Sequence, residues 1–314
     1  MKIVICHKLN RTLTEKLVSR LKNYQLIIAN DYNEAIKYVS DADVIIGATI
    51  PGNIIKEAKK LKLIHTITAG VDKVDLNAVR EVNVPLCNTR GAYSIPVAEH
   101  AIALMMIWEL KLLKQFDYVK SGKWSVVFHG ELTGKVLGII GYGDIGHEIA
   151  KRGKGLGMRT LAIKKSINNQ KDEYLDFLGS IKDLDFVLKE SDYIIIALPL
   201  THETYHMIGE KELGMMKKNA VLVNISRGAV VDETALIKAL KEKWIAGALL
   251  DVLEKEPPDP TNPLLTMDNV IITPHTSGIT ENAFERVVDI IAENLKRLEN
   301  GEKLVNQVDL NKEY

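Results

Sequence analysis

The chain has 314 residues, an apolar fraction of 46%, and equal numbers of basic and acidic side chains, 41 of each. This length fits two ordinary domains, and the composition is that of a globular protein with well-developed cores. Because the charges balance, no overall field attracts the chain to nucleic acid or to an anionic membrane, and we expect neither as a partner.

Short apolar runs alternate with segments of helical period from the first residues onward. The apolar runs are KIVIC, YQLIIA, DVIIGA, KLIHTIT and VPLCNT, separated by segments such as RTLTEKLVSRLKN. This alternation indicates βαβ units and a parallel sheet. Cys6 and Cys87 lie inside two of these runs, which is typical of small core residues in a reducing compartment and argues against a disulfide.

The start of the chain and its apolar runs also bear on location. The sequence opens directly into the strand-like run KIVIC, without a charged segment followed by an apolar one. No apolar run approaches the roughly 18 residues that a membrane span needs. We therefore expect a cytoplasmic protein.

A long helical segment, VAEHAIALMMIWELKLLKQF, follows Pro96. Its apolar residues form two sides of the helix, one with Val97, Ala101, Leu104, Met105, Trp108, Leu112 and Phe116, and the other with Ile102, Met106, Leu110 and Leu113. A helix that is apolar on nearly all sides must be buried on nearly all sides. We expect a core helix between two domains that also contacts a second subunit, and hence a homodimer.

A second alternating series begins at Lys135. Its apolar runs are KVLGII, TLAIKK, YIIIALPL, AVLVNI, IAGALLDVL and NVIITP, with helical segments such as DETALIKALKEK between them. The pattern predicts a second doubly wound parallel sheet, so the fold class is α/β with two such sheets. A final helical segment, AFERVVDIIAENLKRLENG, follows the last run.

The segment KVLGIIGYGDIG has the spacing of a dinucleotide-binding turn. Gly141, Gly143 and Gly146 stand in G-x-G-x-x-G spacing after an apolar strand and at the head of a predicted helix, which Asp144 and Ile145 open. The first glycine permits a tight turn, the second lets the backbone approach a pyrophosphate, and the third lets the helix pack on the strand. The pyrophosphate would lie on the helix N-terminus, where free N–H groups favour an anion. The alternative is a glycine-rich turn without a ligand.

A position beyond these glycines predicts which cofactor binds. An acidic residue that bonds the ribose 2′-hydroxyl is expected roughly twenty residues further on. The sequence has Lys164, Lys165 and Ser166 there instead. An ammonium and a hydroxyl would bind a 2′-phosphate that a carboxylate would repel, so we expect a preference for NADP(H), with NAD(H) also admitted. The alternative is that the two lysines are only a solvated strand end.

Three polar residues follow predicted strands of the second series: Arg227 after AVLVNI, Glu256 after IAGALLDVL and His275 after NVIITP. In an open α/β sheet, ligands bind beyond the carboxyl ends of the strands. Hydride transfer to a 2-oxo acid needs a group such as Arg227 to grip the carboxylate and the carbonyl oxygen, and one such as His275 to exchange a proton with that oxygen. Glu256 would bond the far ring nitrogen of His275, fix its tautomer and raise its pKa. Each residue alone could equally be an ordinary structural or surface residue.

The chain resembles the D-isomer-specific 2-hydroxyacid dehydrogenases over nearly its whole length, in the segments TAGVDKVDL, VAEHAIALMM, GKVLGIIGYGDIG, LPLTHETYHMI, VNISRGAVVDE, ALLDVLEKEPP and NVIITPHTSG. The resemblance implies that Arg227, Glu256 and His275 are the catalytic residues. It implies further binding residues as well, namely Pro199 near the cofactor, Asp251 near the nicotinamide, and the backbone of Ala69, Gly70 and Val71 on the substrate carboxylate. A tight glycine turn of N–H groups suits an anion, which supports the last assignment independently.

The resemblance also implies a domain organisation. A Rossmann-type cofactor domain would comprise residues 96–282, and a flavodoxin-like substrate domain would comprise residues 1–95 together with 283–314, to which the last helix returns. The two domains would close over the substrate and exclude water from the hydride path. Two features depart from the family pattern: Lys164 replaces the usual acid, and the chain ends soon after its last helix, so we expect no appended regulatory domain.

We expect an oxidoreductase that acts on a small D-2-hydroxy acid or 2-oxo acid, with glyoxylate or hydroxypyruvate as first candidates. Phosphoglycerate, formate or phosphite oxidation on a similar scaffold is an alternative. A dinucleotide-sensing regulatory protein is another, because fold alone does not determine function. The intact set of Arg227, Glu256 and His275 argues against a sensor, which needs no proton donor.

The stretch HETYH, from His202 to His206, matches the zinc-protease pattern H-E-x-x-H. A zinc site needs both histidines on one helix face, a third protein ligand and an open position. This stretch follows a predicted strand within two residues and has no recognisable third ligand downstream. We therefore expect no metal.

Overall fold

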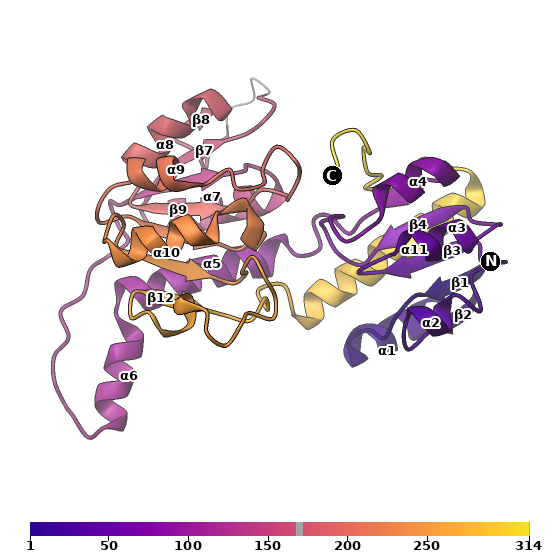
Figure 1. Ribbon diagram of the computed structural model, residues 1–314, viewed down its shortest axis with the longest axis horizontal. Coiled ribbons are helices and arrows are strands. Elements are labelled where there is room, and N and C mark those ends of the chain that lie inside the picture. The colour runs from indigo at the N-terminus through magenta and orange to yellow at the C-terminus, as the bar shows by residue number, and fades with distance from the viewer. Residues whose placement is uncertain (168–171, 314) are drawn as a thin grey trace. The chain divides into compact units, whose positions relative to one another are not determined.

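The computed structural model describes residues 1–167 and 172–313 (Figure 1). The chain divides into two compact units: Met1–Tyr93 with Ile279–Tyr314, and Ser94–Gly278. Each unit is built on its own parallel sheet, which confirms the predicted α/β fold class. Among the helices of the described ranges, none combines the length and the apolarity that crossing a membrane requires.

The first unit contains a five-stranded parallel sheet in the order β2-β1-β3-β4-β5. The strands are β1 (Lys2–Ile5), β2 (Gln25–Ile28), β3 (Val44–Gly47), β4 (Leu63–Thr66) and β5 (Leu86–Cys87). The helices are α1 (Arg11–Arg20), α2 (Tyr32–Ala35), α3 (Gly52–Glu57), α4 (Leu76–Val82) and α11 (Glu281–Asn300).

Side chains that alternate along the strands of this sheet supply two cores. Ile3 and Ile5 of β1 pack with α1 and α11 on one face, whereas Val4 and Cys6 pack with α3 and α4 on the other. This two-sided burial explains why the strands are continuously apolar, since both faces of the sheet are covered by helices. Cys6 and Cys87 are free and buried, as predicted, and burial raises the pKa of each thiol to about 12.

The second unit contains a seven-stranded parallel sheet in the order β12-β11-β10-β9-β6-β7-β8. The strands are β6 (Val136–Ile140), β7 (Arg159–Ile163), β8 (Phe177–Gly179), β9 (Tyr193–Ile196), β10 (Val221–Asn224), β11 (Gly247–Leu250) and β12 (Val270–Ile272). The helices are α5 (Ser94–Glu109), α6 (Leu112–Lys120), α7 (Asp144–Gly155), α8 (Leu184–Glu190), α9 (Glu210–Met215) and α10 (Glu233–Lys241).

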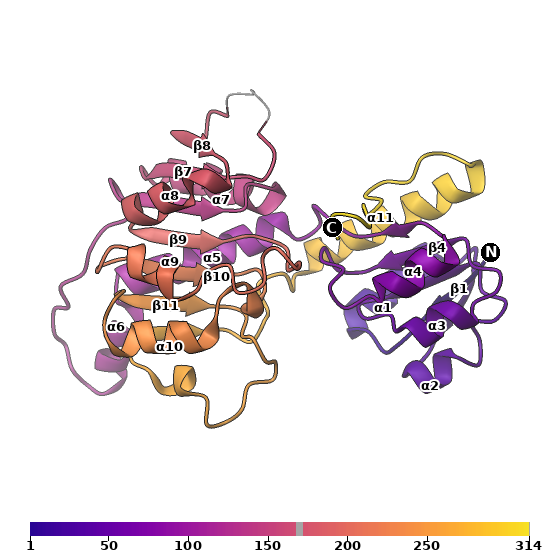
Figure 2. The same ribbon diagram turned by 45° about the horizontal axis from the view of Figure 1, so that its top comes forward.

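Helices cover both faces of the seven-stranded sheet. Figure 2 shows α8, α9 and α10 on one face and α5 and α7 on the other. The chain enters the sheet at β6 and builds outward to β8, and then crosses to β9 on the other side of β6. The strand order therefore reverses between β6 and β9, and open α/β sheets bind dinucleotides at this kind of switch point.

The prediction of a single helix after Pro96 is wrong in its second half, because the structure has two helices there, α5 and α6. Lys111 adopts a left-handed backbone conformation with φ of 53°, which ends α5 and turns the chain into α6. The buried residues of α5 confirm a core helix, whereas α6 has no buried residue and Phe116 is exposed. The apolar pattern continues through the break, so periodicity alone did not reveal it.

Candidate active site

The glycine turn lies between β6 and α7. Gly141 has φ of +106°, and a Cβ atom there would lie 2.5 Å from the carbonyl oxygen of Ala197. A Cβ on Gly146 would lie 2.4 Å from the carbonyl oxygen of Gly141, so the helix meets the strand only without a side chain. A Cβ on Gly143 would meet no described atom within 4 Å, and this residue caps α7 without a side-chain hydrogen bond. The three glycines therefore make the turn, leave one side of it open and present the N-terminus of a long helix.

Lys164, Lys165 and Ser166 follow β7 and are exposed. The backbone N–H of Lys164 donates to the carbonyl oxygen of Gly179 at 2.9 Å, which holds this strand end beside β8. The ammonium of Lys165 forms an ion pair with the carboxylate of Glu203 from the segment after β9. If a cofactor 2′-phosphate binds here as predicted, it would contact two exposed lysines, of which Lys165 already pairs with Glu203.

Sequence reasoning missed a contact between the glycine turn and Asp172. The hydroxyl of Tyr142, inside the glycine turn, donates to Asp172 Oδ2 at 2.6 Å. Burial, and then the bond to Asp172, raises the pKa of Tyr142, so the phenol stays protonated and remains a donor. The variable position of a G-x-G motif carries no sequence signal for such a contact.

The predicted catalytic residues follow three neighbouring strands, β10, β11 and β12, at their carboxyl ends. The Nδ1 atom of His275 lies 2.7 Å from Oε2 of Glu256, whose other carboxylate oxygen accepts from the backbone N–H of Leu253 at 3.0 Å. Because a carboxylate only accepts, Nδ1 of His275 carries the proton that it donates, and Nε2 is the nitrogen available to a substrate. Both side chains are partly exposed, at 42% for His275 and 31% for Glu256.

Arg227 opens the short 3₁₀ segment Gly228–Val230 after β10 and is half-buried. Its Nη1 atom donates to the carbonyl oxygen of Ser226 at 2.8 Å, and the amide of Asn224 donates to the carbonyl oxygen of Arg227 at 2.9 Å. A Cβ on Gly228 would lie 2.0 Å from the backbone of Leu253, so this segment packs directly against the loop that leads to Glu256. Arg227 and Glu256 are thus carried by adjoining loops.

In the first unit, the turn that contains Ala69, Gly70 and Val71 follows β4. Each carbonyl oxygen from Ile67 to Val71 accepts a hydrogen bond. Side chains donate to four of them: Tyr93 Oη to Ile67 at 2.5 Å, Thr66 Oγ1 to Thr68 at 2.7 Å, Asn88 Nδ2 to Ala69 at 2.8 Å, and Thr68 Oγ1 to Gly70 at 2.7 Å. The backbone N–H of Val74 donates to the carbonyl oxygen of Val71 at 3.0 Å. Within the described ranges, the N–H groups of Ala69, Gly70 and Val71 have no acceptor. Consecutive free N–H groups with the carbonyls tied back form an anion-binding concavity. Sequence reasoning found the turn but not Asn88 and Thr68, which hold it.

The HETYH stretch is a turn, not a helix, and His206 Nε2 lies 3.0 Å from Glu254 Oε1. Across residues 1–167 and 172–313, no group of three His, Cys, Asp or Glu side chains is arranged to hold a metal ion. The two histidines therefore do not share a helix face, which the zinc pattern requires.

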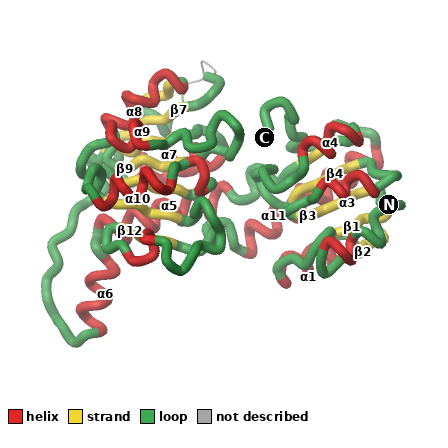
Figure 3. Tube along the Cα trace, viewed as in Figure 1, coloured by secondary structure: helices red, strands yellow, loops and turns green. Residues whose placement is uncertain are grey.

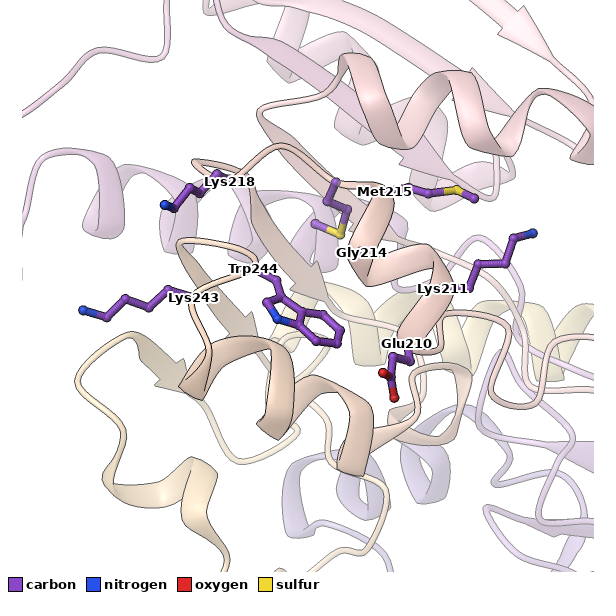
Figure 4. A pocket seen from close by; sticks show the side chains of 8 residues that line it. Glu210, Lys211, Gly214, Met215, Lys218, Lys243 and Trp244 are labelled. Atoms are coloured by element: carbon purple, nitrogen blue, oxygen red, sulfur yellow. The ribbon is translucent and has the colours of Figure 1, made fainter.

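An open hollow lies at the opposite edge of the same sheet, where the chain enters β10 and β11 (Figure 4). Trp244 and Met215 form its apolar part, and Lys211, Lys218 and Lys243 stand around it. In parallel strands this edge lies away from the carboxyl ends that carry the polar residues. The hollow is therefore separate from the candidate active site.

A doubly wound sheet with a glycine turn at its switch point and an Arg, Glu and His set at the same edge define a dinucleotide-dependent oxidoreductase. The family model of the D-isomer specific 2-hydroxyacid dehydrogenase, NAD binding domain, matches residues 102–277. The chain belongs to this family, as its resemblance predicted. It is therefore an enzyme that transfers a hydride between a nicotinamide dinucleotide and a 2-hydroxy or 2-oxo acid.

Three comparisons describe its relatives. A glyoxylate reductase of Korarchaeum cryptofilum is 39% identical over 285 residues, which cover 87% of this chain and 85% of the relative. A D-3-phosphoglycerate dehydrogenase of Methanocaldococcus jannaschii is 37% identical over 300 residues, which cover 94% of this chain and 57% of the relative. The solved NADPH-dependent glyoxylate/hydroxypyruvate reductase of Sinorhizobium meliloti, in complex with NADP and malonate, has a TM-score of 0.83 and 25% identity, covering 98% of this chain and 97% of that one.

Proposed function

We propose that this enzyme reduces a small 2-oxo acid, glyoxylate or hydroxypyruvate, to the D-2-hydroxy acid with NADPH. The observation that carries the proposal is the 2.7 Å contact between His275 and Glu256 at the carboxyl ends of β11 and β12. This contact orients the imidazole and leaves Nε2 available to the substrate, and the imidazolium form, which Glu256 stabilises, carries a proton there. Two of the relatives described above are named as glyoxylate or glyoxylate/hydroxypyruvate reductases, which supports the choice of substrate.

Arg227, His275 and Glu256 of the second unit each have a distinct role in this proposal. Bound NADPH supplies the hydride. Arg227 presents a planar fork of N–H donors to the carbonyl oxygen and the carboxylate, which draws electrons from the carbonyl carbon. His275 donates its Nε2 proton to the carbonyl oxygen as the negative charge develops there. Glu256 accepts from Nδ1, keeps the ring in this tautomer and stabilises the imidazolium form that donates the proton.

The turn of the first unit binds the substrate carboxylate in this proposal. The N–H groups of Ala69, Gly70 and Val71 would each donate to the anion, and the fixed carbonyls would keep them aimed outward. This binding is assigned to the backbone because the side chains of Ala69, Gly70 and Val71 carry no charge. We accordingly propose the first unit as the substrate domain and the second as the cofactor domain.

The cofactor would bind along the carboxyl edge of the second sheet. We propose that the pyrophosphate binds at the glycine turn of Gly141, Gly143 and Gly146, and that the backbone N–H groups of Asp144 and Ile145 at the start of α7 face it. Pro199 after β9 and Asp251 after β11 belong to the same edge and would border the nicotinamide half. We propose that Lys164, Lys165 and Ser166 bind the 2′-phosphate and thereby favour NADPH over NADH.

The test is an initial-rate comparison with three 2-oxo acids, each with NADPH and with NADH. Glyoxylate and hydroxypyruvate should be turned over, and phosphohydroxypyruvate should be the poorer substrate. Two of the relatives described above are named as glyoxylate or glyoxylate/hydroxypyruvate reductases, which supports this order. Preferential turnover of phosphohydroxypyruvate would overturn the proposed substrate and leave the reaction class intact.

We also propose that two copies of the chain form a homodimer through an exposed arm, defined as α6 and residues 121–131. Figure 3 shows α6 continuing into a long loop that runs outside the second sheet and its covering helices. Trp124 is 94% exposed and Phe128 is 89% exposed, and Leu113, Phe116 and Val119 of α6 are exposed as well. Single chains rarely expose an apolar surface of this extent, and twofold pairing of identical patches is the commonest way to cover one.

A further inference from the structure

Asp251 is the centre of a hydrogen-bond network beneath the loop that carries His275. Its side chain is fully buried directly after β11. One carboxylate oxygen accepts from the hydroxyl of Thr273 at 2.6 Å and from the backbone N–H of Thr276 at 3.0 Å. The other accepts from the backbone N–H of Ser277 at 3.0 Å. The carboxylate therefore binds the chain on both sides of His275.

His100 joins this network from α5, which covers one face of the seven-stranded sheet. Its Nε2 atom lies 2.9 Å from the hydroxyl oxygen of Thr273 and 3.6 Å from Oδ1 of Asp251. Because Asp251 only accepts, the Thr273 hydroxyl proton points to the carboxylate, and its oxygen then accepts from the imidazole. The order of donors is fixed: His100 to Thr273, and Thr273 to Asp251.

The backbone of His275 needs such support. Its φ is 49°, a left-handed conformation that is rare for a residue with a side chain and persists where the surroundings hold it. Its N–H donates to the carbonyl oxygens of Asp251 at 2.8 Å and Thr273 at 3.0 Å. Asp251 thus fixes both the peptide of His275 and the segment that leaves it, and Thr273 fixes the peptide.

We propose that His100, Thr273 and Asp251 form a positioning relay that holds the imidazole of His275 in line with the substrate carbonyl. His100 and Thr273 are positioning residues, since they act through Asp251 and the loop and not on the substrate. The relay rests on the proposed function, in which His275 donates the proton. This role is separate from the place beside the nicotinamide proposed for Asp251.

The test compares variants that remove one donor with variants that restore it. Thr273→Val keeps the shape of the side chain and removes the hydroxyl, whereas Thr273→Ser keeps the hydroxyl. His100→Leu removes the ring donor, whereas His100→Gln places an amide N–H near the position of Nε2. Thr266→Val, a change of the same kind in the 3₁₀ segment Pro263–Thr266, is the matched control.

Two readouts are needed, kcat for 2-oxo acid reduction and amide hydrogen exchange at Thr276 and Ser277. We expect Thr273→Val and His100→Leu to lower kcat about tenfold with little change in KM for NADPH, because a misplaced proton donor slows the chemical step. Thr273→Ser and His100→Gln should regain most of the rate. Among these variants, hydrogen exchange at the amides of Thr276 and Ser277 should become faster only in Thr273→Val and His100→Leu.

The outcomes separate the relay from the proposed function. A wild-type protein that turns over no 2-oxo acid would refute the function, while faster exchange in Thr273→Val would still support the relay. An active wild type with unchanged kcat and unchanged exchange in Thr273→Val would overturn the relay. Equal losses of kcat in Thr273→Val and Thr273→Ser would overturn the relay too, because they would show that only packing matters at Thr273.

Discussion

At the residue scale, close packing distinguishes the positions that the sequence revealed from those that it hid. Gly141 and Gly146 could be found from spacing, because a Cβ at either position would collide with backbone and no other residue type fits. Asn88 could not be found in this way. Its partner, the carbonyl oxygen of Ala69, lies 19 residues away in the sequence, and the bond follows from the fold alone. Residues that hold a site by side-chain bonds to backbone have no fixed spacing to search for.

The preference between NADPH and NADH is also decided by single residues. Lys164→Asp should shift the ratio of kcat/KM values toward NADH by about tenfold or more, because a carboxylate repels the 2′-phosphate and accepts from a 2′-hydroxyl. Initial rates with both cofactors measure the ratio. Lys241→Asp at the end of α10 makes the same charge change away from β7 and should leave the ratio as it is. An equal ratio in wild type and Lys164→Asp would mean that the lysine pair is only a solvated strand end.

At the element scale, the turn after β4 illustrates how a binding site is built from backbone. Asn88→Ala should raise KM for glyoxylate about tenfold with a smaller effect on kcat, because the freed carbonyl of Ala69 lets the turn relax. Steady-state kinetics with NADPH in excess measure the change. Asn77→Ala, at an exposed residue that bonds only Arg80 in the described structure, is the control. If Asn88→Ala lowers kcat and leaves KM untouched, the turn does not bind the carboxylate.

The bond between β4 and α11 makes the first unit sensitive to acid. His65 is fully buried, with Nδ1 2.8 Å from the carbonyl oxygen of Thr66 and Nε2 3.0 Å from the amide of Asn294. Burial lowers the pKa of His65 from 6.5 to about 4. The unfolded chain therefore binds a proton that the folded one does not, and stability falls as the pH drops from 6.5 towards 4.

This loss should reach about 3 kcal/mol in the free energy of unfolding, on the basis of 1.36 kcal/mol for each pKa unit. Urea unfolding at pH 7 and at pH 4.5 measures it. His65→Gln keeps an acceptor for Asn294 and removes the titrating ring, so this variant should show a shallower dependence over the same range. An equal slope in both proteins would place the acid sensitivity elsewhere.

The break between α5 and α6 shows the limit of helical periodicity. The pattern of apolar residues continues past Lys111, whose left-handed backbone redirects the chain without any proline or glycine. Apolar residues that indicated burial within the chain lie instead on the exposed arm. Periodicity predicts which face of a helix avoids water, and it does not say what covers that face.

At the scale of the whole molecule, the arm predicts the oligomeric state. Sedimentation should give twice the chain mass of 35.0 kDa for the wild type. Replacing Trp124 and Phe128 with aspartate should give the single-chain mass, because charges cannot be buried unpaired in an apolar contact. Phe186→Asp, at an exposed aromatic on α8, is the control and should remain dimeric. A wild type that sediments as a single chain would contradict the proposal.

Much of the architecture could be predicted, because alternating apolar runs and helical segments specify two parallel sheets. The packing of α11 could not be derived from its own sequence. Its apolar face, with Phe284, Val287 and Ile291, would suit either sheet, and it packs with α1 on the first. For this helix, only the resemblance to a known family had indicated a return to the N-terminal sheet.

The proposed function requires that the chain reduce a small 2-oxo acid with His275 as the proton donor. The most direct measurement is the rate of NADPH oxidation with glyoxylate and with hydroxypyruvate, for the wild type and for His275→Asn. We expect turnover by the wild type and a loss of roughly a hundredfold or more in kcat for the variant, with NADPH still bound. An inactive wild type, or a His275→Asn variant as fast as the wild type, would contradict it.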